Sequence, residues 1–469
     1  MRKTLTTLII AILTITSCDF GNTNIDPTRL SDVPVNQILP AAEAQTARNL
    51  GSVGARITGV IIQHFNGIDN QTLGYNTYLI DENAMDDFWV TGLYAGAMKD
   101  CQIILEKAEA ENLHYYSGIA RVLMAINLGI ITSFWGDAPY SEAFKGQANM
   151  NPKYDSQEDV YNHIHQLLDD AIIEFNLDPG KNNPGIDDLI YGGNRALWLG
   201  TARALKARYY MHLVNHDPDA SAKALQALSG GTIYSNEVQP SFPFGEVLNE
   251  SNPMAYFGTD RPNQLVLNSF LLDFLDSKSD PRKEYYTRLK NGSNVLYDAL
   301  DLTDNLTDLY WGQYNSPMPL ISYSELLFIR AEANIRLGIQ NSAQSQLNSA
   351  IRANMEIMGI DEVAITTYLD AHADLSALST DEEKIGKIIM EKYVAMFGQG
   401  TLEVWVDYRR TGYPALTPST EANESFNPSK IIPRRYLYPI SERNSNNQNV
   451  EIAKQNQGGH LLDNRLWAY

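Results

Sequence analysis

The sequence predicts a mostly α-helical protein whose helices support a ligand-binding face made of long loops. Three observations predict this fold class. Apolar residues recur every three or four positions over several long stretches, which is the period of an amphipathic helix. Residues 194–229 and 322–358 each read as a helix, a short turn and a second helix. The segments between and after these pairs are rich in Pro, Gly, Asn and aromatic residues and lack this period, as is typical of loops.

The N-terminal stretch MRKTLTTLIIAILTITSC has the pattern of a lipoprotein signal peptide. Arg2 and Lys3 precede an apolar run from Leu5 to Ile15. Eleven helical residues rise about 16 Å, well short of the roughly 30 Å hydrocarbon core of a bilayer. We therefore interpret residues 1–17 as a signal peptide. The small residues before Cys18 resemble the bacterial lipobox, in which this cysteine becomes the first mature residue and carries acyl chains. The alternative is an ordinary signal peptide followed by an incidental cysteine.

The rest of the chain is expected to be one lipid-anchored domain. Residues 18–31 read as a polar tether behind Cys18, and residues 32–469 as a single helical domain with loop-rich insertions at about 230–320 and 399–469. No run after the signal peptide is expected to approach a membrane span. The tail 399–469 is expected to lie on the surface, with its aromatic residues beside polar groups.

Two helices are predicted early in the chain. The first lies within 154–175, where Ser156 and Asp159 form a start signal. The second lies within 194–215 and opens the first helix pair. Cys101 falls on a helical pattern, at a position where it is expected in the core.

Two further helices carry start and stop signals. The stretch 322–338 opens with Ser322 and Glu325, the spacing of a capping box, and leads into the second helix pair. The stretch 380–398 opens with a Thr380/Glu383 box. Each helix pair spans about 36 residues, close to the tetratricopeptide period of about 34. The pairs are not contiguous, so they predict a scaffold with insertions and not a free-standing solenoid.

Charge and composition exclude several functions. A net charge of −20 argues against binding of nucleic acid, because phosphate recognition needs a basic surface. Cys101 is the only cysteine besides Cys18, so no thiolate nucleophile or cysteine metal site has the partners it needs. His163 and His165 lie two apart and would point to different faces of a helix. The acidic stretch DALDLTDNLTD lacks the glycine and closing glutamate of a calcium loop. No metal or cofactor is expected.

Seven stretches, in order behind the lipobox, resemble the SusD/RagB family of outer-membrane nutrient-binding lipoproteins of Bacteroidetes. The resemblance covers nearly the whole mature chain. The stretches are NIDPTRLSDVPVNQILPAA (24–42), FWVTGLYAGAMKDCQIILEKAE (88–109), SFWGDAPYSEAF (133–144), PKYDSQEDVYNHI (152–164), YGGNRALWLGTARALKARYYMHL (191–213), PLISYSELLFIRAEANIRLG (319–338) and PRRYLYPISERNSNNQNV (433–450).

The resemblance implies a SusD-like fold and a role in nutrient capture. Members of the family have tetratricopeptide-like helix pairs that support a loop-rich, ligand-holding face. They sit at the cell surface as lids on a SusC-like TonB-dependent transporter, and they capture glycans or sometimes other oligomers. The family offers no catalytic residues to carry over, so the chain is not expected to be an enzyme. The resemblance implies an oligosaccharide as the ligand. It also implies that the lipid anchor holds the protein at the outer membrane.

Two clusters have the composition that sugar binding needs. Aromatic faces stack on pyranose rings, while amides and carboxylates form hydrogen bonds with the sugar hydroxyls. The first cluster is LYWGQYN, and the second is QHFNGIDNQTLGYNTY. The candidate ligand-binding residues are Tyr310, Trp311, Gln313, Tyr314 and Asn315 in the first, and His64, Phe65, Asn66, Asp69, Tyr75 and Tyr78 in the second. The alternative is that these aromatic rings fasten the loops to the scaffold.

Other functions remain open at this stage. A tetratricopeptide-type adaptor of the envelope would bind a protein in its helix grooves, but it is expected to carry consecutive repeats. Capture of a non-sugar ligand such as a peptide is a second alternative. A surface glycoside hydrolase would need two carboxylates across a cleft. Adjacent acids such as Asp86 and Asp87 diverge on a helix instead.

Overall fold

The computed structural model describes residues 33–178, 180–262, 264–286, 288–290, 293–295 and 311–469. The fold class is confirmed, because helices dominate the described chain and the strands are short. Cys18, the predicted signal peptide (1–17) and the whole predicted tether (18–31) lie outside the described residues, as does Tyr310.

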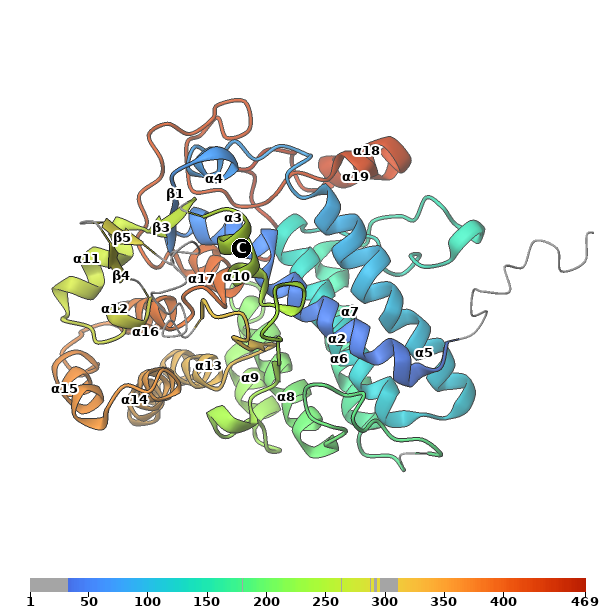
Figure 1. Ribbon diagram of the computed structural model, residues 1–469, viewed down its shortest axis with the longest axis horizontal. Coiled ribbons are helices and arrows are strands. Elements are labelled where there is room, and N and C mark those ends of the chain that lie inside the picture. The colour runs from blue at the N-terminus through green and yellow to red at the C-terminus, as the bar shows by residue number, and fades with distance from the viewer. Residues whose placement is uncertain (1–32, 179, 263, 287, 291–292, 296–310) are drawn as a thin grey trace, which may run out of the picture.

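The elements follow one another along the chain, with helices throughout, one short strand near the start and the other short strands in the middle (Figure 1). The first half contains α2 (Val35–Gly51), α3 (Val53–Ile61), β1 (Phe65–Gly67), α4 (Asn70–Asn76), the π-helical stretch η2 (Phe88–Met98), α5 (Lys99–Glu111), α6 (His114–Trp135), η3 (Gly146–Ala148), α7 (Gln157–Glu174), α8 (Arg195–His212) and α9 (Ala220–Leu228). The middle contains η4 (Asn236–Val238), β2 (Ser241–Phe242), η5 (Leu248–Glu250), α10 (Pro253–Asp260), β3 (Leu265–Leu267), α11 (Ser269–Ser277), α12 (Lys283–Tyr286), β4 (Arg288–Lys290), β5 (Ser293–Val295) and β6 (Met318–Pro319). The last part contains α13 (Tyr323–Arg336), α14 (Gln340–Ile357), α15 (Glu362–His372), α16 (Asp381–Ala395), α17 (Thr401–Thr411), α18 (Ile440–Ser445) and α19 (Asn447–Asn456).

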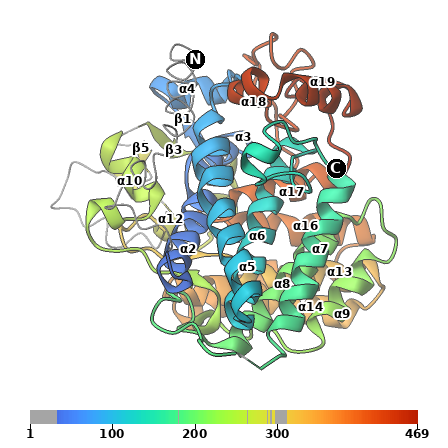
Figure 2. The same ribbon diagram turned by 90° about the vertical axis from the view of Figure 1, so that its right-hand side faces the viewer.

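The two predicted helix pairs are confirmed as α8/α9 and α13/α14, and they belong to one continuous layer. In the order α5, α6, α7, α8, α9, α13, α14, each helix packs on the next. Figure 2 shows α5, α6 and α7 running side by side in this layer. The pairs are separated in sequence, yet α9 packs directly on α13. The segment between these helices therefore leaves the layer and returns to it without interrupting the packing.

The central helix α6 departs from the expectation that no run after the signal peptide approaches a membrane span. Among the residues that the structure describes, it is the one helix long and apolar enough to cross a membrane by length and composition. In its apolar window, 94% of the residues are buried inside the protein. Because α6 packs on α2, α5, α7, α8 and η2, its apolar surface serves the core.

The segment between α9 and α13 carries a small sheet. Its strands lie in the order β1-β3-β5-β4, with β1 and β3 antiparallel and Asn66 opposite Val266. A second, two-stranded sheet pairs β2 with β6, and both strands pack against α2. The pairing of β1 with β3 connects two segments that lie about two hundred residues apart in sequence. The middle of the chain is thus fastened to the segment just after α3.

The tail from residue 399 is less irregular than predicted. It opens with α17, a helix on which Trp405 is fully buried, and it ends with α18 and α19. Tyr436 and Tyr438 are also fully buried, so the expectation of surface aromatics in this segment is wrong for both. The tail fills the space between α3, α6 and α8, where α17 packs.

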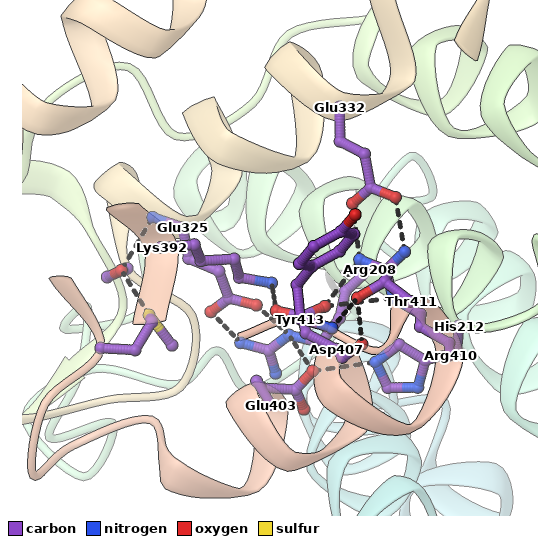
Figure 3. A network of polar contacts seen from close by, with 12 residues as sticks. Arg208, His212, Glu325, Glu332, Lys392, Glu403, Asp407, Arg410, Thr411 and Tyr413 are labelled. Carbon is purple, nitrogen blue, oxygen red and sulfur yellow. Dashed lines mark hydrogen bonds and ion pairs between the residues drawn. The ribbon is translucent and has the colours of Figure 1, made fainter. Parts of the chain in front are cut away.

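Helix α17 presents a charged face to the core. Glu403, Asp407 and Arg410 are four and three residues apart, so they lie on one side of the helix (Figure 3). Arg410 binds Glu332 of α13 through both terminal nitrogens and donates to Asp407 at 2.6 Å. Lys392 of α16 lies 2.8 Å from the second oxygen of Asp407. All are buried, and buried charges are tolerated only when they are paired in this way.

The network continues to α8, the first helix of the first pair. Arg208 donates to Glu325 of α13, and His212 lies 2.8 Å from Glu403. Burial alone would raise the pKa of Glu403, but the nearby Arg208 and His212 hold that pKa far below its usual value. The network joins α8, α13, α16 and α17 and thereby fixes the scaffold on which the loops stand.

Candidate functional site

The two clusters that composition selects lie side by side in the structure. Phe65 at the start of β1 and Trp311 in the loop before β6 have ring centroids 6.0 Å apart. The ring of Phe397, in the turn after α16, touches both, at 5.4 Å from Phe65 and 5.3 Å from Trp311. Segments that are separated in the sequence thus meet on one face, around β1, β3, α4 and α10 (Figure 1).

The inner part of this meeting point is an aromatic cluster. The His64 ring lies 4.3 Å from Tyr393 and 5.3 Å from Phe397. His64 and Phe65 are fully buried, and Trp311 is 1% exposed. A ring without an accessible face cannot stack on a sugar, so the structure contradicts the prediction that these three side chains contact ligand. They fasten the loops to the core, which is the alternative that the sequence left open.

His64 is held as a neutral imidazole. Its Nε2 lies 2.8 Å from the carbonyl oxygen of Tyr393, and because a carbonyl can only accept, Nε2 carries the proton. Burial lowers the pKa of His64 from 6.5 to about 3. The Tyr393 hydroxyl donates in turn to the Gln63 carbonyl at 2.8 Å. These bonds fix the start of β1 against α16.

The rings of Tyr75 and Tyr78 are also packed in the core and are not accessible to a ligand. Each is 3% exposed. Burial raises the pKa of Tyr75 to about 12. The Tyr78 hydroxyl accepts a hydrogen bond of 3.1 Å from the backbone N–H of Ser419. The predicted ligand contacts are therefore wrong for these two rings, which instead bind α4 to the core and to the tail.

The outer residues of both clusters remain accessible. Asp69 and Asn315 are exposed, and Asn66, Gln313 and Tyr314 are half-buried. Asn66 is oriented by Asn76, whose Nδ2 donates to its Oδ1 at 2.8 Å. Asp69 caps α4 and accepts 2.8 Å hydrogen bonds from the backbone and side chain of Asn70. These polar groups stand on the buried cluster in fixed orientations.

An exposed tyrosine that sequence reasoning missed lies on the same face. Tyr256 on α10 is 46% exposed. Thr259 lies three residues further, on the same side of the helix, and its Oγ1 shares a 2.9 Å hydrogen bond with the Tyr314 hydroxyl. The backbone N–H of Asn252 donates to the Tyr314 carbonyl at 2.7 Å. Asn252 followed by Pro253 is a helix-start signal that could have placed α10 and its exposed face.

Apolar side chains complete this face. Ile68, Leu73 and Leu79 are 45%, 50% and 52% exposed, and all three lie on or beside α4. We call Asn66, Asp69, Tyr256, Tyr314 and Asn315, together with these apolar neighbours, the loop face. It combines an aromatic ring, apolar surface, amides and a carboxylate, which is the chemistry that recognises a pyranose ring and its hydroxyls.

The interior offers no comparable room beside the ion network. A cavity of about 50 Å³ lies between α13, α16 and α17, with Arg208, Glu325 and Glu403 in its wall. This volume holds a few waters and not a sugar ring. Among the described residues, no three His, Cys, Asp or Glu side chains are placed to hold a metal ion.

Comparisons with known proteins place the fold. The model of a family named SusD-like_2, described as "Starch-binding associating with outer membrane", matches residues 27–439. A solved SusD/RagB family protein from Bacteroides thetaiotaomicron is 24% identical, with a TM-score of 0.78, over 93% of this chain and 99% of that one. A chitin-binding protein is 23% identical, with a TM-score of 0.75, over 92% and 99%. A SusD homologue from Bacteroides fragilis is 22% identical, with a TM-score of 0.76, over 93% and 99%. No curated protein matches the chain.

Proposed function

The chain belongs to the SusD-like family, and from this premise we propose that it captures oligosaccharides at the cell surface. It passes them to a SusC-like TonB-dependent transporter of the outer membrane, for which it acts as a lid. Cys18 carries the lipid anchor, residues 18–31 form the tether, and residues 32–469 form the binding domain. The protein acts by binding and cleaves no bond.

The observation that carries the proposal is the arrangement of the loop face. Exposed Tyr256 lies three residues before Thr259, which is hydrogen-bonded to Tyr314. The orientations of Asn66 and Asp69 are fixed by neighbouring amides. Preorganised polar groups beside an aromatic face lose little conformational entropy when a sugar binds. The buried partners, Phe65 and Trp311, supply the rigid base of this arrangement.

Thermal melting of the full chain, in a detergent without a sugar headgroup, tests the ligand class. A ligand that binds only the folded state raises the melting temperature by mass action. We expect a starch oligosaccharide or a chitin oligosaccharide to raise it, since the family description and one structural neighbour name these polymers. If peptides raise the melting temperature and no saccharide does, the sugar assignment is wrong and the capture role stays.

Single substitutions test the loop face. Tyr256→Ala and Asp69→Ala are expected to weaken saccharide binding about tenfold each, which corresponds to about 1.4 kcal/mol. Tyr256→Ala should leave the melting temperature of the free protein unchanged, whereas Asp69→Ala also removes the N-cap of α4 and should lower it slightly. Tyr234→Ala is the matched control, because Tyr234 is 67% exposed and lies after α9, away from this face. Equal affinities for Tyr256→Ala, Asp69→Ala and wild type would remove the loop face from the proposal.

The anchor and the transporter need separate tests. Cys18→Ser is expected to abolish metabolic labelling with a radioactive fatty acid and to release the protein from the membrane fraction. Wild-type protein extracted from native outer membranes is expected to co-purify with a β-barrel transporter. An adaptor of the tetratricopeptide type would instead co-purify with a soluble envelope protein, and saccharides would leave its melting temperature unchanged.

A further inference from the structure

A second groove lies at the other side of the molecule, between the start of α7, the end of α19 and the last residues of the sequence. Its volume is about 800 Å³, within the range of roughly 300–1,000 Å³ that small-molecule sites occupy. In Figure 2 the end of the chain lies on the right, between α19 and α7, whereas α10 and the sheet lie on the left. The groove is therefore separate from the loop face.

Trp467 in the wall of this groove is the one tryptophan of the chain with an accessible ring. It is 39% exposed, whereas the other five tryptophans are at most 2% exposed. The His216 ring stacks on it, with centroids 4.2 Å apart and an angle of 24° between the planes. Because His216 covers one face, the exposed part of the indole belongs to its other face and its edge. An aromatic ring with one open face beside polar groups can stack on the apolar face of a pyranose ring.

The residues on both sides of Trp467 are fixed in the core. Leu466 is 2% exposed, and Ala468 is fully buried. The backbone N–H of Ala468 donates to Gln157 Oε1 at 2.8 Å, and Gln157 Nε2 donates to the Thr132 carbonyl at 2.8 Å. The Tyr469 hydroxyl shares a 2.6 Å hydrogen bond with that of Tyr161. The indole is thus held in place before any ligand arrives, so that binding costs little conformational entropy.

Three polar side chains of the groove make no bond within the described part of the protein. The side chains of Glu158, Asn456 and Arg465 line the groove and are exposed, and they form no hydrogen bond or ion pair with any other residue that the structure describes. A carboxylate accepts, a guanidinium donates, and an amide does both. Sugar hydroxyls need both kinds of partner beside an aromatic face. Two exposed carboxyl groups, Glu158 and Asp159, and the buried Asp137 against the one guanidinium of Arg465 make the acidic groups of the lining outnumber the basic ones, which disfavours acidic sugars.

We propose that this groove, which we call the Trp467 groove, is a second saccharide site that binds a neutral pyranose unit by stacking on Trp467. The ligand class rests in part on the proposed function, while the location rests on the groove itself. The Trp467 groove could hold a saccharide while the loop face is occupied. The occupant would be either the far part of one long neutral oligosaccharide bound at the loop face or a second oligosaccharide molecule.

Acrylamide quenching of intrinsic fluorescence reports on this groove directly, because Trp467 is the one accessible tryptophan. The full chain in detergent is titrated with acrylamide alone and with maltohexaose, chitohexaose or hexagalacturonate. At least one of the two neutral hexasaccharides is expected to lower the quenching constant about twofold or more, and the acidic one to leave it unchanged. Protection by hexagalacturonate alone would overturn the proposal.

Variants separate the groove from the loop face. Trp467→Ala and Asn456→Ala are expected to weaken the binding that remains in a Tyr256→Ala background about tenfold. Gln455→Ala, on the neighbouring exposed residue of α19, is the control and should match its parent. Protection of Trp467 by the neutral sugar should persist in Tyr256→Ala. If saccharide binds and raises the melting temperature while Trp467 stays fully quenchable, the second site is wrong and the proposed function stands. If no saccharide binds at all, both fall.

Discussion

The guanidinium of Arg208 donates two hydrogen bonds to the carboxylate of Glu325, at 2.8 and 2.6 Å, across 117 residues of sequence. Arg208 lies on α8 and Glu325 on α13, so this contact joins the two tetratricopeptide-like pairs at the point where the long insertion returns to the layer. Both side chains are almost completely buried, at 4% and 0% exposure. A planar fork on a carboxylate restricts both distance and angle, so the contact also sets how the pairs are aligned.

Arg208→Met is expected to lower the free energy of unfolding by about 3–5 kcal/mol, because the carboxylates of Glu325 and Glu403 would lose a buried partner. Urea unfolding followed by circular dichroism measures this loss. Lys430→Met is the control, since its pair with Glu424 is solvent-exposed and should change stability by less than about 1 kcal/mol. A loss for Arg208→Met no larger than for Lys430→Met would show that the contact does not join the pairs.

Glu332 predicts how the protein responds to acid. Burial would raise its pKa, but the charge and hydrogen bonds of Arg410 hold it at about 2, below the ordinary 4.5. The ionised form is therefore favoured by folding, and its contribution is fully present above pH 4.5 and is lost as the pH falls from 4.5 towards 2. We expect a loss of about 3 kcal/mol over this window. In Glu332→Gln this part of the pH dependence should disappear, whereas Glu109→Gln, at an exposed position of α5, should keep it.

The helix scaffold was readable from the sequence because its signals are local. Thr380 and Glu383 form the reciprocal capping box that their spacing predicts at the start of α16. Ser322 accepts from the backbone N–H of Glu325 as predicted, at 3.0 Å. The reciprocal half is missing there, because the Glu325 carboxylate is engaged by Arg208. A charge 117 residues away is invisible to a local pattern.

The candidate site was only half readable for a similar reason. Interleaved aromatics and amides look the same in sequence whether a ring points outwards or into the core. In β1 the burial alternates, with Phe65 buried, Asn66 half-buried and Gly67 buried, and this two-residue period is the signal that could have sorted them. Three residues are too few to reveal it. The rings that pack on Phe65 are those of Trp311 and Phe397, which no spacing connects to it.

His64 predicts a second pH dependence, which begins at a higher pH. Because burial lowers its pKa from 6.5 to about 3, the folded state leaves it neutral where the unfolded chain takes up a proton. The free energy of unfolding should therefore fall as the pH drops from 6.5 towards 3, by about 1.4 kcal/mol per pH unit for this group. His64→Gln is expected to reduce the proton uptake on unfolding at pH 5 by about one, measured from the slope of stability against pH.

His163→Gln controls for the loss of an imidazole at a half-buried position of α7. His165 and His460 also have pKa values lowered by burial, to about 4 and about 2, so the slope in His64→Gln should decrease and not vanish. An unchanged slope in His64→Gln would mean that this imidazole is protonated in the folded protein at pH 5.

Gly67 holds β1 and α4 in close contact. A Cβ at this position would lie 1.9 Å from the carbonyl oxygen of Thr72 and 2.3 Å from its carbon. Neither atom can move alone, because β1 is paired with β3 and the Thr72 hydroxyl donates to the Gln264 carbonyl at 2.6 Å. Only a residue without a side chain allows this approach.

Gly67→Ala is therefore expected to push α4 away from β1. This shift would move the side chains of Asp69 and Asn66 from their positions on the loop face. Overpacking of this kind costs about 1–3 kcal/mol of stability, and affinity for saccharide at the loop face should fall with it. Gly74→Ala on the same helix is the matched control, because its Cβ would meet no atom closer than 3.8 Å and should stabilise α4 by about 0.5–1 kcal/mol. Calorimetric titration measures the affinity of both variants, and urea unfolding measures their stability.

If Gly67→Ala loses stability and keeps its affinity, Asp69 and Asn66 do not bind the ligand. If Gly67→Ala loses neither stability nor affinity, the backbone of Gly67 does not approach the Thr72 carbonyl as closely as described above.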